Sequence, residues 1–292
     1  MLLSGIQGSR LDSRLRGNDK MLIKTALIPI PIPIPISILY LLLFFGAGCS
    51  TEYNLATNQQ ETLIYGTEKE MKIGEAVAQQ FDSHFSIDND AEINARVRKV
   101  LDRIVAVCDR QELVYTIKVI DEDKMNAVSL PGGYVYVYKG LLDKLDNDDQ
   151  LAGVISHEIG HIAARHAIKR LQGSYGYLLL QILAVQSGSA GVASGVQAAY
   201  LSMFLAHSRE DEYEADRIGI KYMREAGYNP EEMTSVLKKL KAQEDKEPSR
   251  ELSYWRTHPY LSERISFSNK EVTGELQFKD YLNIMGNDDE KH

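Results

Sequence analysis

His157-Glu158-Ile159-Gly160-His161 lies within a stretch whose apolar residues recur at helical spacing, beginning near Asp148-Asp149. The two aspartates are good N-terminal capping residues for such a helix. Residues four apart share one helix face, so both imidazoles can bind a single metal ion there. Glu158 is turned slightly aside and can reach a water molecule beside that ion. The HExxH pattern therefore predicts a metal site with His157 and His161 as ligands and Glu158 as the general base.

A catalytic zinc site needs a third protein ligand and one open coordination position for water. Some zinc enzymes supply a histidine six residues after the second one, with a glycine between, but these positions hold Ala167 and Ala164. The stretch from Ser208 to Asp216 offers carboxylates instead. Glu212 and Asp216 share a helix face, so we expect Glu212 to bind the metal and Asp216 to accept a proton from a ligand histidine. The other acidic residues fall on other faces and are expected to be solvated charges: Glu210, Asp211 and Glu214.

Further motifs extend over most of the chain, from about Thr67 to Phe267. Besides the residues above they comprise Asn126-Ala127, Leu130-Pro131-Gly132-Gly133, Gly140-Leu141-Leu142, Arg165-His166, Ser208-Arg209, Ala215, His258-Pro259 and Glu263-Arg264-Ile265. In these features the chain resembles the gluzincin metalloproteases that include the CAAX prenyl proteases, the membrane protease HtpX and the periplasmic BepA-type proteases. We expect a member without the helical repeat domain that BepA-type proteases carry after the protease domain.

The resemblance implies both a fold and a reaction. The fold is α+β: a mainly helical zincin-type metalloprotease domain with a small mixed sheet, whose edge strand borders the active-site cleft. The reaction is endopeptidase hydrolysis with one Zn²⁺ per chain, in which the metal polarises the scissile carbonyl and Glu158 passes a proton from water to the leaving amine. A ligand set of two histidines and one glutamate suits zinc best among the divalent ions.

The alternating run from Gly133 to Tyr138 is the strand that we expect at this edge. Such an edge can receive an extended peptide through main-chain hydrogen bonds. The tyrosines of the run are also compatible with a half-buried strand face: Tyr134, Tyr136 and Tyr138. A second strand is expected from Leu113 to Ile120.

His258 gains a candidate role from the resemblance alone. His258 or Arg264 would face the metal cleft, where either could steady the oxyanion of the reaction. Alternatively, His258 would occupy the open position on zinc and keep the enzyme latent, or it is a plain surface histidine before a proline. His258 is therefore the third candidate catalytic residue, with Glu158 and Asp216.

The remaining histidines and Cys108 receive plain structural interpretations. His166 lies five residues after His161 and does not share its helix face. Cys108 follows an apolar run and is expected to be a small buried thiol. The other histidines have no partner pattern: His84, His207 and His292.

The N-terminus is interpreted as an export signal. Lys24 precedes an uncharged apolar run that ends in Gly46-Ala47-Gly48-Cys49. These last four residues resemble the lipobox of bacterial lipoproteins, although the first of them is usually leucine. We expect a cleaved signal with a lipid on Cys49, and an uncleaved anchor is the alternative. Residues 1–20 are polar and basic, so Met21 is the expected start.

The sequence divides into four parts. An export segment (1–48) is followed by a polar tether (49–66), the zinc metalloprotease domain (67–285) and a polar tail (286–292). Thr67 and Glu70 form a capping-box pattern, which predicts that a helix opens the domain. Apolar spacing predicts further helices at about 91–107, 148–171, 209–226 and 230–243.

The stretch from Leu171 to Ser208 has no charged residue and a middle rich in Gly, Ala and Ser. Glutamines interrupt it, so its apolar pieces are short for spanning a membrane. We favour a helical lid over the cleft, and a membrane hairpin is the alternative.

Charge and location narrow the expected partners. The chain carries a formal net charge of −8, and beyond the first 48 residues it has 28 basic against 39 acidic side chains. This excess of acidic side chains beyond residue 48 argues against nucleic acid as a partner. By resemblance we expect unfolded or misassembled envelope proteins as substrates, and a periplasmic location with the lipid of Cys49 in a membrane, the outer membrane being favoured. The rival hypothesis is a zinc-bound chaperone-like or assembly factor with latent protease activity, and the intact Glu158 argues against a dead enzyme.

Overall fold

The computed structural model describes residues 50–173, 207–250 and 253–273. The predictions for the export segment, the lipid on Cys49, most of the stretch 171–208 and the polar tail lie outside these residues. Among the described residues no helix is both long and apolar enough to span a membrane. The elements follow in the order β1 (Ser50–Asn54), β2 (Gln59–Leu63), α2 (Thr67–His84), α3 (Ala91–Val105), β3 (Thr116–Ile120), β4 (Ala127–Leu130), β5 (Tyr134–Tyr138), α4 (Lys139–Leu142), α5 (Asp148–Ala163), α6 (His166–Gly173), α9 (Arg209–Glu225), α10 (Glu231–Glu244), α11 (Tyr254–Thr257) and α12 (Leu261–Thr273).

The main sheet is mixed, as expected, but its order corrects one prediction. The strands lie in the order β3-β5-β4, with β5 parallel to β3 and antiparallel to β4. The run from Gly133 to Tyr138 therefore forms the central strand and not an edge. The two edge strands are β3 and β4, and the four residues of β4 are too few to show an alternating pattern in the sequence.

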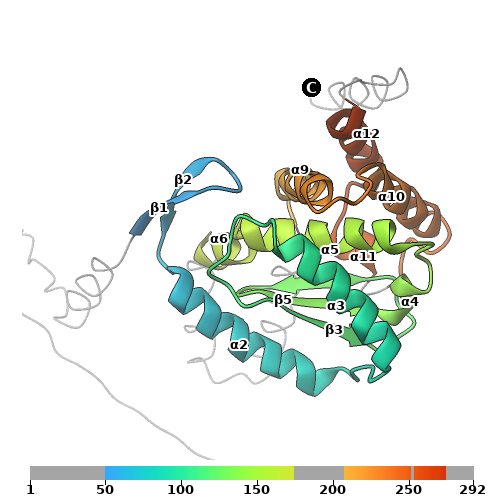
Figure 1. Cartoon of the computed structure of the whole chain (residues 1–292), viewed down its shortest axis with the longest axis horizontal. Coiled ribbons are helices and arrows are strands. Elements are labelled where there is room, and N and C mark those ends of the chain that lie inside the picture. The colour runs from blue at the N-terminus through green and yellow to red at the C-terminus, as the bar shows by residue number, and fades with distance from the viewer. Residues whose placement is uncertain (1–49, 174–206, 251–252, 274–292) are drawn as a thin grey trace, which may run out of the picture. The chain divides into compact units, whose positions relative to one another are not determined.

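Both faces of β5 are covered by other parts of the chain. Val135 and Val137 pack into the main core with residues of α3 and α5. Tyr136 and Tyr138 point to the other face and pack with Phe81 of α2 and its neighbours. Figure 1 shows α2 and α5 on opposite sides of the sheet. The layer order is thus α2, sheet, then α3 and α5.

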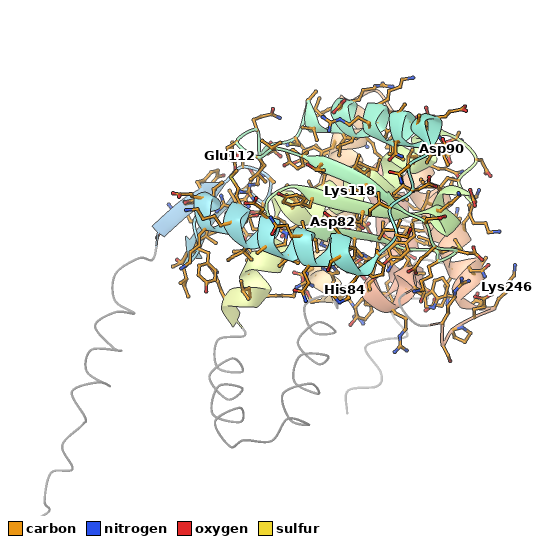
Figure 2. The ribbon with its side chains drawn as sticks, turned by 90° about the horizontal axis from the view of Figure 1, so that it is seen from below. Asp82, His84, Asp90, Glu112, Lys118 and Lys246 are labelled. Carbon is orange, nitrogen blue, oxygen red and sulfur yellow. The ribbon has the colours of Figure 1, made fainter. Side chains whose placement is uncertain are left out.

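A polar contact closes the α2 side of this arrangement. The hydroxyl of Tyr136 donates a hydrogen bond to Asp82 at 3.0 Å, and Lys118 of β3 lies 2.6 Å from the other oxygen of the same carboxylate. Asp82 and Lys118 lie side by side in Figure 2, which views the molecule with α2 in front of the sheet. The tyrosines of β5 therefore form a covered strand face.

Residues 50–63 form a hairpin where a tether was expected. Strands β1 and β2 pair antiparallel. The side chain of Asn54 donates hydrogen bonds of 2.9 Å to Glu61 and to the carbonyl oxygen of Ala163 at the end of α5. Leu63 is buried. A polar hairpin that is held by side-chain hydrogen bonds shows little apolar periodicity, and this is why the sequence suggested a loose segment.

The helix from Thr67 is present, but the expected capping box is not. Gly66 is the N-cap and makes no side-chain cap. The hydroxyl of Thr67 instead accepts a hydrogen bond from Arg165 at 3.1 Å. Glu70 is buried, and its carboxylate lies 2.9 Å from the guanidinium of Arg110. Glu70, which the sequence pattern assigned to the capping box, thus forms a buried ion pair instead.

The helix that was expected to run to about Leu171 is interrupted. Asn147 caps its start, helix α5 ends at Ala163, and Arg165 adopts a left-handed backbone with φ of 57°. A non-glycine residue in this region ends a helix, because the next carbonyl can no longer continue the ladder. A separate helix, α6, then begins at His166.

Two glycines allow α5 and α9 to pack closely. A Cβ on Gly160 would lie 2.7 Å from the carbonyl oxygen of Ala215, and a Cβ on Gly219 would lie 3.1 Å from the backbone nitrogen of His157. Helix α9 starts with a capping box between Ser208 and Asp211 and ends before Gly227, as its sequence predicts. This close pairing places the acidic turn of α9 against the histidines of α5.

Candidate metal centre

The two histidines of α5 face each other in a buried pocket. Their Nε2 atoms lie 3.0 Å apart. From α9, the carboxylate of Glu212 approaches both, at 3.4 Å from Nε2 of His157 and 3.3 Å from Nε2 of His161. All three side chains are almost completely buried. The three residues that the sequence proposes as metal ligands are therefore brought together in space.

Asp216 contacts the ring of His157 on the side opposite to Glu212. Its Oδ1 lies 2.8 Å from Nδ1 of His157. Burial opposes the ionisation of Asp216, but Arg264 outweighs burial and keeps the pKa of this carboxyl below its ordinary value. As an ionised carboxylate can only accept, Nδ1 of His157 donates, and its Nε2 is left to face Glu212. This contact is the one that the orienting role predicted for Asp216 requires.

Arg264 lies on the far side of the two carboxylates. Its Nε and Nη2 donate to Asp216 at 2.8 and 2.7 Å. Its Nη1 lies 2.5 Å from Oε2 of Glu212. Arg264 is fully buried, so its charge is not screened by water. The guanidinium thus fixes the relative position of Glu212 and Asp216.

The donor set at the centre fits a metal ion. Burial raises the pKa of Glu212, but Arg264 and the neighbouring histidines outweigh it and hold that pKa well below its ordinary value, so Glu212 is a carboxylate. Burial lowers the pKa of His161 well below its ordinary value, so its imidazole is neutral. Burial and Arg264 lower the pKa of His157, but Asp216 and Glu212 outweigh them and raise it to about 9. The carboxylates thus favour a positive charge where the two Nε2 atoms meet, and a divalent cation would supply it.

Glu158 is buried beside this centre, and its carboxylate makes no protein hydrogen bond within the described part of the chain. The Nε2 atom of His258 lies 3.4 Å from Oε1 of Glu158. A buried carboxylate without donors is costly unless water, substrate or another ligand completes its surroundings. Such a carboxylate is suited to take a proton from a water molecule.

His258 belongs to the same cluster and is not a surface residue. Its Nδ1 lies 3.1 Å from Glu212 and 3.4 Å from Nε2 of His157, and the side chain is buried. Its ring stacks on Tyr254 at a centroid distance of 4.4 Å. Ligand atoms of His258, Glu212, His157 and His161 all lie within 4.8 Å of one another. Both residues that the resemblance pointed to, His258 and Arg264, thus reach the centre.

The sequence interpretation missed two histidines of this region. His166 Nδ1 lies 2.7 Å from Nδ1 of His161, although a continuous helix would turn it away. The left-handed residue Arg165 redirects the chain and brings His166 back. The ring of His207 lies 3.8 Å from that of His161 between centroids. Only the Arg165-His166 pair among the family motifs gave a signal for His166, and nothing in the sequence pointed to His207.

Glu214 and Asp211 correct a further prediction, because they are not simply solvated charges. Oε2 of Glu214 lies 3.2 Å from Nε2 of His166, and Oδ1 of Asp211 lies 3.6 Å from the same nitrogen. Asp211 also completes the cap of α9. Both residues are partly covered in the folded chain.

A small pocket adjoins the histidines at the end of β4. Its lining includes Ser129, Leu130 and Pro131 together with His161 and His207. The end of the edge strand and a member of the metal cluster thus share one pocket.

Comparison with known proteins agrees with this geometry. The sequence profile of peptidase family M48 matches residues 91–272, which include every residue of the cluster. The chain belongs to peptidase family M48. Family members are metallopeptidases, so this chain is a metalloprotease of the hydrolase class and of the gluzincin type that the motifs indicated.

Similar M48 proteins occur in bacteria and in mitochondria. The beta-barrel assembly-enhancing protease of Escherichia coli is 28% identical over 233 residues, which cover 76% of this chain and 47% of that protein. The mitochondrial metalloendopeptidase OMA1 of Schizosaccharomyces pombe is 33% identical over 172 residues, covering 58% of this chain and 50% of OMA1. The putative beta-barrel assembly-enhancing protease of Vibrio cholerae is 27% identical over 214 residues, covering 70% and 44%. The chain thus spans about half the length of these relatives.

Proposed function

We propose that this M48 protein is a zinc-dependent endopeptidase of the bacterial envelope that acts on unfolded or misassembled proteins. The observation that carries the proposal is the convergence of His157, His161 and Glu212 on one buried point, beside the carboxylate of Glu158, which accepts no hydrogen bond from the described residues. Two imidazoles and a carboxylate are the ligand set of catalytic zinc in many hydrolases.

The chain's own residues divide the work of hydrolysis. Zinc, when bound by His157, His161 and Glu212, would polarise the scissile carbonyl and make water acidic. Glu158 takes the proton of the attacking water and gives it to the leaving amine. Asp216 fixes the ring of His157 through Nδ1, which increases the ligand's basicity.

The substrate would lie along β4. This strand is an edge of the sheet, and the pocket at its end is shared with His161. An extended peptide that pairs with an edge strand binds through main-chain hydrogen bonds and needs no particular sequence. Binding of this kind suits unfolded proteins as substrates.

The envelope location rests on the N-terminal pattern and on the names of two relatives, which are beta-barrel assembly-enhancing proteases. The apolar run that ends in Gly46-Ala47-Gly48-Cys49 supports export and a lipid on Cys49. Mass spectrometry of the membrane fraction tests this proposal. An acyl group on Cys49 is the expected result, and an unmodified Cys49 in a soluble fraction contradicts it.

The enzymatic proposal is tested by zinc content and casein cleavage, measured in parallel for the wild type and Glu158→Gln. We expect both proteins to bind zinc and only the wild type to cleave, since Glu158 is not a ligand. The loss expected for a general base is at least about 10²-fold. Absence of zinc from the wild type contradicts the metal site, and cleavage by Glu158→Gln at the wild-type rate contradicts the role of the base.

A second candidate function is a zinc-bound assembly factor whose protease activity is latent. The buried position of His258, 3.1 Å from Glu212, favours it, because a fourth protein ligand would close the open zinc position. In this case His258→Ala gains casein cleavage and keeps its zinc. If His258→Ala leaves both activity and zinc content unchanged, the latent form is wrong. Biological activity that survives in Glu158→Gln would favour the assembly factor over the protease.

A further inference from the structure

The side chains behind His161 form a chain of contacts that the ligand set does not include. His166, at the start of α6, places Nδ1 at 2.7 Å from Nδ1 of His161. Its other nitrogen, Nε2, lies 3.2 Å from Oε2 of Glu214 on α9. His166 is only 2% exposed, so water does not replace these contacts. Three polar groups from three helices are thus joined in one line that ends at His161.

The position of each proton in this line follows from the proposed metal site. Nε2 of His161 lies 3.3 Å from Glu212 and faces that site, so it needs its lone pair for the metal and the proton of His161 stands on Nδ1. Nδ1 of His161 then donates to Nδ1 of His166 at 2.7 Å. Nε2 of His166 carries the other proton and donates to the carboxylate of Glu214 at 3.2 Å.

The two histidines of the HExxH motif are consequently held in different ways. His157 donates directly to a carboxylate, Asp216, at 2.8 Å. His161 donates to a neutral imidazole, and a carboxylate stands one residue further back. Each arrangement suits the same tautomer, with Nε2 free for a metal, because Nδ1 of each histidine has an acceptor within 2.8 Å.

We propose that His166 and Glu214 are positioning residues that fix the tautomer and ring orientation of His161 for metal binding. The inference rests on the proposed metal site and adds two residues behind its ligands. Neither residue touches the substrate or the metal.

A competing assignment is a second metal ion held by His161, His166 and His207, whose ligand atoms lie within 4.8 Å of one another. A neutral imidazole has one lone pair, and the proposed metal site already uses that of His161 on Nε2. The 2.7 Å between the Nδ1 atoms of His161 and His166 is a hydrogen-bond distance. A second metal on Nδ1 would require a fully deprotonated His161, so the relay of hydrogen bonds is favoured.

The test measures zinc affinity of the full chain by competition with a chromophoric chelator. His166→Leu removes the acceptor for His161, and we expect its zinc affinity to fall about 10- to 100-fold. His166→Asn places an amide oxygen close to where Nδ1 stands and should restore most of that loss. Glu214→Gln keeps an acceptor oxygen and should lose less than Glu214→Leu. Glu210→Leu is the matched control, because Glu210 is an exposed carboxylate one turn before Glu214 in α9, and it should bind zinc as the wild type does.

A second readout separates positioning from a loss of folding. The absorption spectrum of the cobalt-substituted protein reports ligand geometry, and we expect a changed spectrum for His166→Leu and a wild-type spectrum for His166→Asn. Thermal unfolding in the presence of a chelator shows whether each variant is folded without metal. If His166→Leu is folded and binds zinc as tightly as the wild type, the relay is wrong and the metal site stands.

Two further outcomes overturn the relay. A wild type that binds two zinc ions, one of which is lost in both His166→Leu and His166→Asn, makes His166 a ligand. A wild type that binds no zinc overturns the relay together with the proposed function. Zinc binding without casein cleavage leaves the affinity comparison intact, so failure of the enzyme and failure of the relay are distinguishable.

Discussion

Arg264 shows how a single residue stabilises this buried site. Its guanidinium contacts the carboxylates of both Asp216 and Glu212. Two carboxylates in one dry pocket repel each other, and a shared cation between them offsets that repulsion. Arginine is suited to this position because its planar group donates several hydrogen bonds in fixed directions.

We predict that Arg264→Met destabilises the chain by about 3–5 kcal/mol, because removal of one partner leaves Asp216 buried without its cation. Chemical denaturation in the presence of a chelator measures the loss without a contribution from metal. Arg256→Met is the control, since Arg256 is exposed on α11, and it should change stability by no more than about 0.5 kcal/mol. A loss below about 1 kcal/mol for Arg264→Met would mean that the ion pairs contribute little.

At the scale of elements, the helices could be predicted and the connections could not. Helices α2, α3, α9 and α10 have apolar residues at helical spacing, and the structure confirms all four within a few residues. The break at Arg165 has no sequence signal, because arginine does not favour a left-handed backbone. Strand β4 and the hairpin of β1 and β2 are short or polar, so their tertiary contacts determine them.

The candidate site follows the same division. The shared helix face of His157 and His161 on α5 and that of Glu212 and Asp216 on α9 were predictable, because each depends only on helical spacing. The positions of His166 and His207 depend on how separate segments meet, and a single sequence does not contain that information. His258 and Arg264 came from family resemblance, and spacing gave no reason for them.

The contact between α5 and α9 gives a prediction about Gly160. In most helices Gly→Ala is stabilising by roughly 1 kcal/mol. Here the new Cβ would lie 2.7 Å from the carbonyl oxygen of Ala215, and α9 would have to move. We therefore expect Gly160→Ala to destabilise the chain by about 1–3 kcal/mol and to weaken zinc binding, because Glu212 moves with α9.

Gly173 provides the matched control for this substitution. A Cβ on Gly173 would meet no described atom within 4 Å, so Gly173→Ala should leave stability unchanged or slightly increased. Thermal unfolding of both variants, together with zinc titration, makes the comparison. Equal stability of Gly160→Ala and the wild type would mean that the two helices are packed less tightly than the structure has them.

The break between α5 and α6 gives a prediction about Arg165. Arg165→Gly and Arg165→Ala both lose the contacts of the guanidinium with Glu52 and Thr67, so the difference between them reports the backbone alone. With φ of 57°, we expect the glycine variant to be the more stable by about 1 kcal/mol. Denaturation curves of the two variants test this, and a more stable alanine variant would indicate a continuous helix.

At the scale of the whole molecule, the metal centre joins segments that lie far apart in the sequence. Its residues come from α5, α9, α12 and the turn after α11. Helix α9 packs against both α5 and α12, although His157 of α5 and Arg264 of α12 are 107 positions apart in the sequence. A metal bound at this point would therefore stabilise the packing of these helices in addition to its part in catalysis.

We predict that zinc stabilises the folded chain by about 3–4 kcal/mol at zinc concentrations 100 to 1,000 times the dissociation constant. The expected result is a Tm that rises with added zinc and falls with a chelator. Glu158→Gln should show the same shift, because Glu158 is not a ligand, and His161→Ala should show little. Equal shifts for the wild type and His161→Ala would place the bound metal elsewhere.

The hairpin of β1 and β2 limits how far the folded domain of a lipid-anchored chain can move from the membrane. Strand β1 begins at Ser50, directly after the proposed lipid site at Cys49. An unfolded segment as long as residues 49–66 would have an end-to-end distance of roughly 20–25 Å, and an anchored domain could move over that distance from the membrane. Because that segment is folded against the end of α5, a lipidated chain would have almost no flexible linker between the lipid and the folded domain. The protease would then work only within a thin layer at the membrane surface, and proteins deeper in the periplasm would have to diffuse to that surface to be cut.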